Sequence, residues 1–284
     1  EQHGQLLKGE FDVAQERIND CRKLGLLPVD FCLEDTKRAA VNVEDIHGRN
    51  VDTYTERLAA FVAGDIENYA PFSFWDDKDV YVQMYVEKLD LRPLFEPVCA
   101  KYRVPLANVG GWGDLNGRAE FMERFKRHEA AGRRCVLLYC GDHDPGGLLI
   151  SASLRDNLAE LSAAVGWAPD NLVIDRFGLN FDFIQAHKLK WIDNLETGGG
   201  GRLDDPKHKF HRMPYVQEYL RQFGARKVEA NALVVIPDEA RRLCEGAILR
   251  WVKDSSAPER YEAQLVPWIE LLRATVNKRF MNGV

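Results

Sequence analysis

The chain has 284 residues, of which 45% are hydrophobic and 29% are charged, and its formal net charge is −6 at pH 7. These shares are typical of a globular protein, and no apolar run reaches the roughly 18–20 residues that cross a bilayer. The negative total charge argues against a protein that coats nucleic acid by bulk attraction, although a localised basic groove stays compatible with it.

The six cysteines show neither a CxxC pair nor a zinc-type spacing with histidine. We interpret them as small core residues in a reducing cytosol. No signal-peptide pattern opens the sequence, so we expect a cytoplasmic protein. The first residue is Glu1 rather than Met, which is consistent with a piece of a longer protein.

The first 70 residues are predicted to be mostly helical. Residues 11–27 and 50–64 carry apolar side chains near helical spacing, and each stretch has a glycine at or near its end. Residues 69–79 are rich in turn formers and aromatic residues, and we interpret them as the passage to a second part. We therefore predict a helical N-terminal segment over 1–70 and a separate domain over 79–284.

Strands and helices alternate from residue 79 onward. The predicted strands are 80–87, 104–110, 134–140 and 171–177, and the predicted helices between them are 88–102, 115–132 and 146–166. Such alternation is typical of βαβ units, whose parallel sheet is covered by helices on both faces. The sequence therefore predicts an α/β fold.

The pattern is weaker beyond residue 180. Residues 196–206 have the composition of an exposed flexible loop, and 214–224 are predicted to form a helix. Residues 226–235 are interpreted as a short strand or turn. A closing helical segment is predicted over 257–280, interrupted or kinked at Pro267.

Three features gather at the expected carboxyl ends of the strands, where open parallel sheets bind ligands. Glu87 ends the first strand, Gly110 and Gly111 follow the second, and Asp142 and Asp144 follow the third. Residues two apart in extended backbone point the same way, so three carboxylates are expected to converge. At about 4–5 Å their repulsion would total on the order of 10 kcal/mol, which a divalent cation or protonation of one carboxyl would relieve. Carboxylate oxygens suit Mg²⁺ or Mn²⁺, so a phosphoryl-transfer centre is predicted.

Other interpretations of the same loop stay open. A phosphatase with an aspartyl nucleophile is one, although its Asp-x-Asp usually ends the first strand of the sheet rather than the third. A structural loop in which Asp144 caps the following helix is another. His143 points away from its neighbours in extended geometry, so we do not expect it to be a metal ligand.

Three stretches resemble the Glu…Gly…Asp-x-Asp series of the Toprim domain. They are YVEKLDL, NVGGWGD and LLYCGDHDPGG, all within residues 79–150. The similarity is greatest to the branch found in the A subunit of type IIB topoisomerases (topoisomerase VI) and in the related meiotic double-strand-break proteins. That branch has a Val-Glu-Lys strand end and an Asp-x-Asp-Pro-x-Gly loop. Residues 175–189 and 228–235 resemble later family segments more loosely.

The resemblance implies a Rossmann-like Toprim domain whose Glu87, Asp142 and Asp144 hold Mg²⁺, or Mn²⁺, and are catalytic. The Glu is alternatively a general acid or base in this family. Gly110 or Gly111 would let the backbone bend close to the site. Glu229 would support the site or a subunit contact.

The resemblance further implies DNA as the substrate and Mg²⁺-dependent DNA binding and cleavage as the function. A homodimer is expected, with an ATPase or another subunit as a partner, no membrane association, and a prokaryotic or phage-infected cell as the setting. The helical segment over 1–70 would then be the remnant of a DNA-binding domain. In that setting the basic stretches 118–134 and 207–212 become candidate contacts to the DNA backbone, with Arg118, Arg124, Lys207 and Arg212 as the first residues to test.

One departure from the family concerns its nucleophile. Family topoisomerases cut DNA with a tyrosine in an Arg-rich Tyr-Tyr motif before Toprim, and neither Tyr54 nor Tyr69 has flanking basic residues. Either that tyrosine precedes Glu1 in a longer chain, or the protein is a plain metal-dependent nuclease, or it only binds DNA as a module of a larger complex. A phosphatase acting on small phosphate esters is a weaker alternative. No Gly-Lys-Ser/Thr phosphate loop occurs in the sequence.

Overall fold

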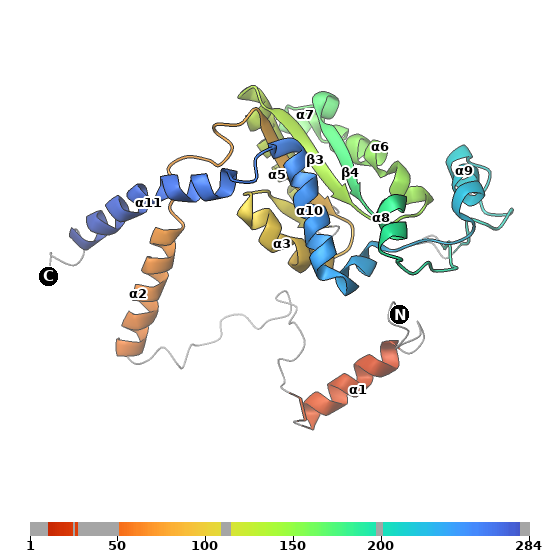
Figure 1. Ribbon diagram of the computed structural model, residues 1–284, viewed down its shortest axis with the longest axis horizontal. Coiled ribbons are helices and arrows are strands. Elements are labelled where there is room, and N and C mark those ends of the chain that lie inside the picture. Colours follow the sequence, from red (N-terminus) through yellow and green to blue (C-terminus); the bar gives the residue numbers. More distant parts are fainter. Residues whose placement is uncertain (1–10, 25, 28–50, 109–114, 197–200, 279–284) are drawn as a thin grey trace. The chain divides into compact units, whose positions relative to one another are not determined.

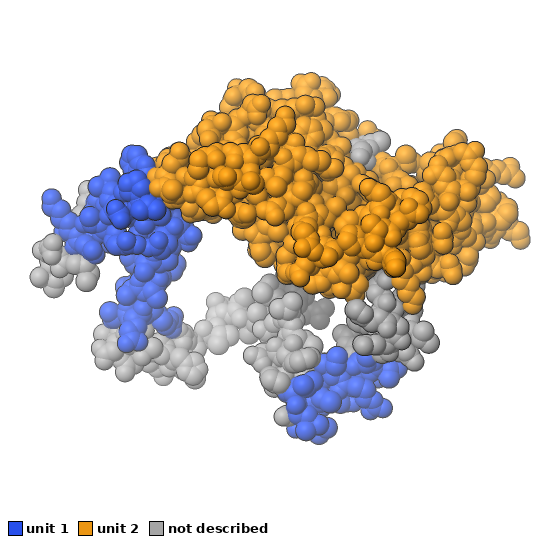
Figure 2. All heavy atoms as spheres, in the orientation of Figure 1, with its two compact units in different colours: residues 1–70, 265–284 blue, residues 71–264 orange. Residues whose placement is uncertain are grey.

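The computed structural model describes residues 11–24, 26–27, 51–108, 115–196 and 201–278 (Figure 1). The chain divides into two compact units, which Figure 2 colours separately. One unit comprises residues 1–70 with 265–284, and the other comprises residues 71–264. None of the helices in the described ranges combines the length and the apolar character that crossing a membrane requires.

The secondary structure described for the first unit is helical. It contains α1 (Phe11–Lys23), α2 (Val51–Glu67) and the C-terminal half of α11 (Ala257–Val276). The guanidinium of Arg273 on α11 pairs with the carboxylate of Glu67 at the end of α2. Helix α11 continues through Pro267, so the sequence prediction of an interruption there was wrong.

A four-stranded parallel sheet forms the centre of the second unit. The strands are β1 (Val80–Val86), β2 (Leu106–Asn108), β3 (Arg134–Cys140) and β4 (Val173–Gly178), in the order β2-β1-β3-β4. All three pairings are parallel, which confirms the predicted α/β fold with a parallel sheet. Strands β1 and β3 occupy the two central positions, and every residue of both except Arg134 is buried.

Helices and two 3₁₀ turns surround the sheet. They are α3 (Leu91–Lys101), α5 (Leu115–Ala130), α6 (Pro145–Ala159), α7 (Ser162–Val165), η5 (Pro169–Asn171), α8 (Phe181–Ala186), α9 (Pro214–Phe223), η6 (Ala230–Val235), α10 (Pro237–Val252) and the start of α11. Residues 226–235 thus end in a 3₁₀ helix, where the sequence left a short strand or a turn. The elements are labelled on the ribbon in Figure 1.

Consecutive residues of β1 identify the layers on the two faces of the sheet. The Gln83 amide donates to the carbonyl oxygen of Phe121 on α5 at 3.0 Å. The Met84 sulfur lies 3.6 Å from Cys99 Sγ on α3 and 3.9 Å from Cys244 Sγ on α10. Because neighbouring residues of a strand point to opposite faces, α5 covers one face, and α3 with α10 covers the other.

Candidate functional site

The predicted site begins where β1 and β3 end side by side. Val86 is paired with Cys140, and the Glu87 N–H donates to the Cys140 carbonyl oxygen at 2.9 Å. The chain then leaves β3 through Gly141 and enters α6, whose N-cap is Asp144. The Asp144 Oδ1 accepts a hydrogen bond from the Gly147 N–H at 2.6 Å, so this carboxylate does cap the helix.

The Glu87 side chain is hydrogen-bonded to the Asp-His-Asp loop and to the strand before it. Its Oε2 accepts hydrogen bonds from the Tyr139 hydroxyl at 2.8 Å and from the backbone N–H of Asp142 at 2.9 Å. Burial, followed by the charge of Glu87, raises the pKa of the Tyr139 phenol. Glu87 therefore links the ends of two neighbouring strands to the start of the loop.

Asp142 is a buried carboxylate with both oxygens engaged, and 4% of the residue is exposed. Its Oδ1 accepts from the backbone N–H of Ala230 at 2.8 Å, and its Oδ2 lies 2.9 Å from Lys88 Nζ. Burial raises the pKa of Asp142, and the nearby charge of Glu87 raises it further, whereas the hydrogen bonds from Ala230 and Lys88 oppose the rise.

The third carboxylate, Asp144, is within electrostatic reach of the second. Burial raises its pKa, and the charge of Asp142 adds to the rise. Burial lowers the pKa of Lys88, but the hydrogen bond and charge of Asp142 and the charges of Glu87 and Glu229 outweigh it, so the net shift is upward. The cluster therefore consists of carboxylates that repel one another, and the ammonium of Lys88 pairs with the most buried of them, Asp142.

Two residues that complete the cluster were not predicted from the sequence, Lys88 and Arg176. The Arg176 guanidinium, on β4, donates to the carbonyl oxygens of Asp142 at 3.0 Å, Gly147 at 3.0 Å and Leu179 at 2.7 Å. It therefore fixes the backbone on both sides of the loop. Lys88 follows Glu87 in the Val-Glu-Lys stretch, so its position was visible in the sequence, although its contact with Asp142 was not.

His143 points away from the carboxylates, as extended geometry predicted. Its backbone pairs with Val228, its Nδ1 lies 3.2 Å from the Leu179 carbonyl oxygen, and 2% of the residue is exposed. Burial lowers the pKa of the imidazole to about 4, so the ring is neutral at pH 7. Its Nε2 is buried without a hydrogen-bond partner in the described part of the chain.

The other predicted residues fall into three groups. Gly110 and Gly111 lie outside the described residues. Arg118 donates to the Asn157 carbonyl oxygen at 3.1 Å, and Arg124 donates to Gln83 Oε1 at 2.8 Å, so both arginines hold α5 in place. Lys207 and Arg212 are exposed.

Glu229, the weaker site residue of the prediction, lies beside the cluster. Its carboxylate pairs with Lys227 Nζ at 2.8 Å, and the backbone of the next residue, Ala230, binds Asp142. Over the described ranges no three His, Cys, Asp or Glu side chains stand in an arrangement that could hold a metal ion. In this arrangement the ammonium of Lys88 and two backbone N–H groups satisfy Asp142 and Glu87 instead.

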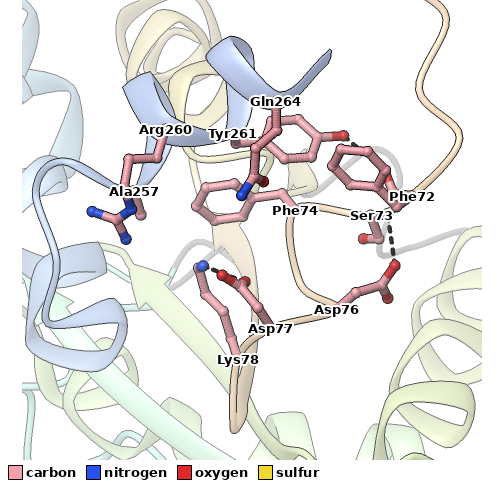
Figure 3. Close-up of a pocket in the computed structure, with 10 residues that line it drawn as sticks. All are labelled: Phe72, Ser73, Phe74, Asp76, Asp77, Lys78, Ala257, Arg260, Tyr261 and Gln264. Carbon is pink, nitrogen blue, oxygen red and sulfur yellow. Dashed lines mark hydrogen bonds and ion pairs between the residues drawn. The ribbon is translucent and has the colours of Figure 1, made fainter. Parts of the chain in front are cut away.

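Cavities also occur at the opposite edge of the sheet, where the strands begin. One of about 310 Å³ lies between the approach to β1 and the start of α11 and is drawn in Figure 3. Its polar groups bind one another: Lys78 Nζ lies 2.7 Å from Asp77 Oδ1, and the Tyr261 hydroxyl donates to the Phe72 carbonyl oxygen at 3.0 Å. We therefore interpret it as a joint between elements rather than as the reactive site.

Comparison of the chain with protein-family models, with curated proteins and with solved structures gives no match. The resemblance in the Glu87 and Asp142 stretches consequently stays a prediction from short motifs.

Proposed function

We propose that this chain is a Toprim-type protein of the topoisomerase VI A-subunit class, which binds DNA and acts on its phosphodiesters with Mg²⁺ at Glu87, Asp142 and Asp144. The observation that carries the proposal is the junction of Glu87 with the Asp142 loop. Acidic side chains from the ends of two central parallel strands meet there, and Asp142 is almost fully buried. A carboxylate in that position is stabilised by a cation.

The donor set fits a hard divalent cation. All three candidate ligands are carboxylates, and the charge of each neighbour raises the pKa of Asp142 or Asp144, so added positive charge would be favourable. The described side chains do not surround one point as metal ligands do, so binding requires Glu87, Asp142 and Asp144 to move closer together and Lys88 Nζ to leave Asp142 Oδ2. When bound, that cation would neutralise phosphate charge and activate water or another nucleophile.

The residues around the carboxylates would position the catalytic groups and the phosphate. Tyr139 and the Asp142 N–H orient Glu87, which leaves it placed to hold or move a proton beside the bound phosphate. Arg176 and the Ala230 N–H fix the position of Asp142 through hydrogen bonds to its carbonyl oxygen and its Oδ1. Lys88, once released from Asp142, supplies an ammonium for a phosphate oxygen.

The basic residues that support DNA binding are Lys207 and Arg212. Both are exposed, whereas the guanidinium groups of Arg118 and Arg124 are used in packing. We accordingly assign backbone contacts to Lys207 and Arg212 and a structural role to the two arginines of α5. Two copies of the chain would present two such sites to the two strands, and light scattering with and without DNA would reveal such a dimer.

The experiment that tests the proposal is conversion of supercoiled plasmid to nicked or linear DNA with Mg²⁺ or Mn²⁺. The unmodified protein should cut, the Asp142→Asn variant should not, and the Asp238→Asn variant should cut normally because Asp238 lies on α10 with its side chain 78% exposed. Cutting that persists in Asp142→Asn would overturn the assignment of the site.

A second function is favoured by one observation: Lys88 already neutralises Asp142. The chain would then be a non-catalytic DNA-binding or assembly module whose Toprim-type site holds no metal. This alternative predicts salt-sensitive DNA binding and no cutting with any divalent cation. The plasmid assay, run beside a binding assay, separates the two functions.

A further inference from the structure

Three aromatic side chains form a partly exposed shelf against His143. The shelf consists of Phe181, Trp191 and Phe223, whose ring centroids lie 6.2, 5.6 and 4.8 Å from that of His143. The Trp191 and Phe223 rings are stacked with an interplanar angle of 21°, and Phe181 lies 5.0 Å from Phe223. Phe181 is 37% exposed, and the other two are half-buried.

The shelf is joined to the carboxylate loop through two consecutive residues. Lys227 exchanges backbone hydrogen bonds of 2.8 and 2.9 Å with Ile192, the neighbour of Trp191. Val228 exchanges bonds of 2.8 and 3.2 Å with His143, between the two aspartates of the loop. The shelf and the proposed phosphodiester site therefore belong to one hydrogen-bonded piece of structure.

Positive charge lies on the shelf. The Arg226 guanidinium is 4.3 Å from the centroid of the Trp191 ring, and its Nε donates to the Phe223 carbonyl oxygen at 2.8 Å. Arg226 is also exposed. The shelf therefore combines exposed aromatic surface with one guanidinium stacked on it.

A role in core packing does not account for the whole cluster. It explains Tyr219, which is 3% exposed and donates its hydroxyl hydrogen bond to the His143 carbonyl oxygen at 2.7 Å. It does not explain why Phe181 keeps more than a third of its surface exposed beside Arg226 and Trp191.

We propose that Phe181, Trp191 and Phe223 stack an unpaired nucleobase of the strand whose phosphodiester is handled at Glu87 and Asp142, on the side of the loop toward which His143 points. Bases stack on aromatic rings and on arginine planes irrespective of their sequence, and the Arg226 guanidinium suits a neighbouring phosphate. This inference rests on the proposed function and names its substrate class: single-stranded or locally unpaired nucleic acid, bound more tightly than a continuous duplex.

The test is equilibrium binding of a fluorescein-labelled single-stranded oligonucleotide in EDTA, followed by anisotropy, with a duplex of the same length beside it. The Phe181→Leu variant keeps the apolar contact and removes the ring, so its affinity for the single strand should fall about fivefold or more while its duplex affinity is unchanged. Phe181→Tyr restores a ring and should bind like the unmodified protein. Trp268→Leu, at a side chain 44% exposed on α11, is the matched control and should have no effect.

The outcomes separate this inference from the proposed function. If the unmodified protein binds neither form of DNA, in EDTA or with Mg²⁺ added, both fall. If it binds DNA but Phe181→Leu binds the single strand as well as the unmodified protein does, only the shelf is overturned, and the plasmid assay still decides the function. A thermal unfolding curve for each variant shows whether it is folded, and a loss of affinity in Phe181→Leu that Phe181→Tyr does not rescue would also overturn the shelf.

Discussion

Lys88 Nζ lies 2.9 Å from Asp142 Oδ2. The residue that follows Glu87 therefore supplies the positive charge that pairs with Asp142, the most buried carboxylate of the site. Three charges that the sequence predicted to need a metal are thus partly balanced from within the chain. Whether Lys88 acts as a resting partner for Asp142 can be measured through stability as well as through activity.

We predict that Lys88→Met lowers the free energy of unfolding by about 2 kcal/mol, because it leaves Asp142 buried without its ammonium partner. The expected loss is below that of a fully buried pair because the Lys88 side chain is 30% exposed. Urea unfolding of Lys88→Met, Asp142→Asn and the double variant measures the coupling between the two residues. Additive losses in the double variant would contradict the contact.

The two glycines after Pro145 should differ sharply. A Cβ on Gly147 would lie 2.1 Å from the Asp142 carbonyl oxygen, whereas a Cβ on Gly146 would meet nothing closer than Asp144 Oδ1 at 3.5 Å. Gly147→Ala should therefore cost about 3 kcal/mol or more, and Gly146→Ala should change stability by less than about 0.5 kcal/mol. Equal melting temperatures for the two variants would contradict the described path of the loop.

Stability should depend on pH through His128, which stacks on Tyr81 with ring centroids 3.6 Å apart. Burial, followed by the charges of Arg133 and Arg127, lowers the pKa of His128 to about 4 from 6.5. As pH falls through 6.5 the unfolded chain takes up the proton first, so this contribution to stability is lost between pH 6.5 and about 4. His128→Phe keeps the stack and removes the titration.

The corresponding measurement is urea unfolding at pH 7.5 and pH 5. The unmodified protein should lose about 1 kcal/mol more than His128→Phe between the two values, a figure reduced from the full shift because the ring is only half-buried. The same loss in both proteins would show that His128 does not contribute.

Substitution of Arg212 should affect DNA binding, whereas substitution of Arg118 should affect stability. Arg212→Gln should weaken DNA binding and reduce the salt dependence of the affinity by about one counterion, with little change in the free energy of unfolding. Arg118→Gln should do the reverse and lower stability by about 1 kcal/mol, because it loses the bond to the Asn157 carbonyl oxygen. Anisotropy titrations at several salt concentrations and urea unfolding measure the two effects, and DNA binding that depends on Arg118 alone would contradict the division.

The sheet could be predicted because its strands carry strong local signals. Val136 to Cys140 form a continuous apolar run between two turns, and the predicted strand 134–140 coincides with β3. Helix α10 was missed, although its apolar residues Ala240, Cys244 and Ile248 are spaced for one face and Pro237 begins it. The apolar spacing over residues 237–252 is therefore sufficient to predict a helix there.

The site was predictable only as far as it depends on strand ends. Glu87 and Asp142 come together because β1 and β3 are paired in register, which follows from the α/β pattern. The partners that neutralise Asp142 depend on long-range contacts: Ala230 is 88 residues away in the chain. No local pattern indicates that a backbone N–H from η6 will reach the loop, so this part of the site required the structure.

The central claim is that the carboxylates at this edge of the sheet hold a divalent cation for phosphodiester chemistry. Electron paramagnetic resonance of Mn²⁺, with a short DNA oligonucleotide present, counts the ions bound per chain. We predict Mn²⁺ binding that is lost in both Asp142→Asn and Glu87→Gln and retained in Asp238→Asn. Undiminished binding in Asp142→Asn, or no binding by the unmodified protein, would contradict the account.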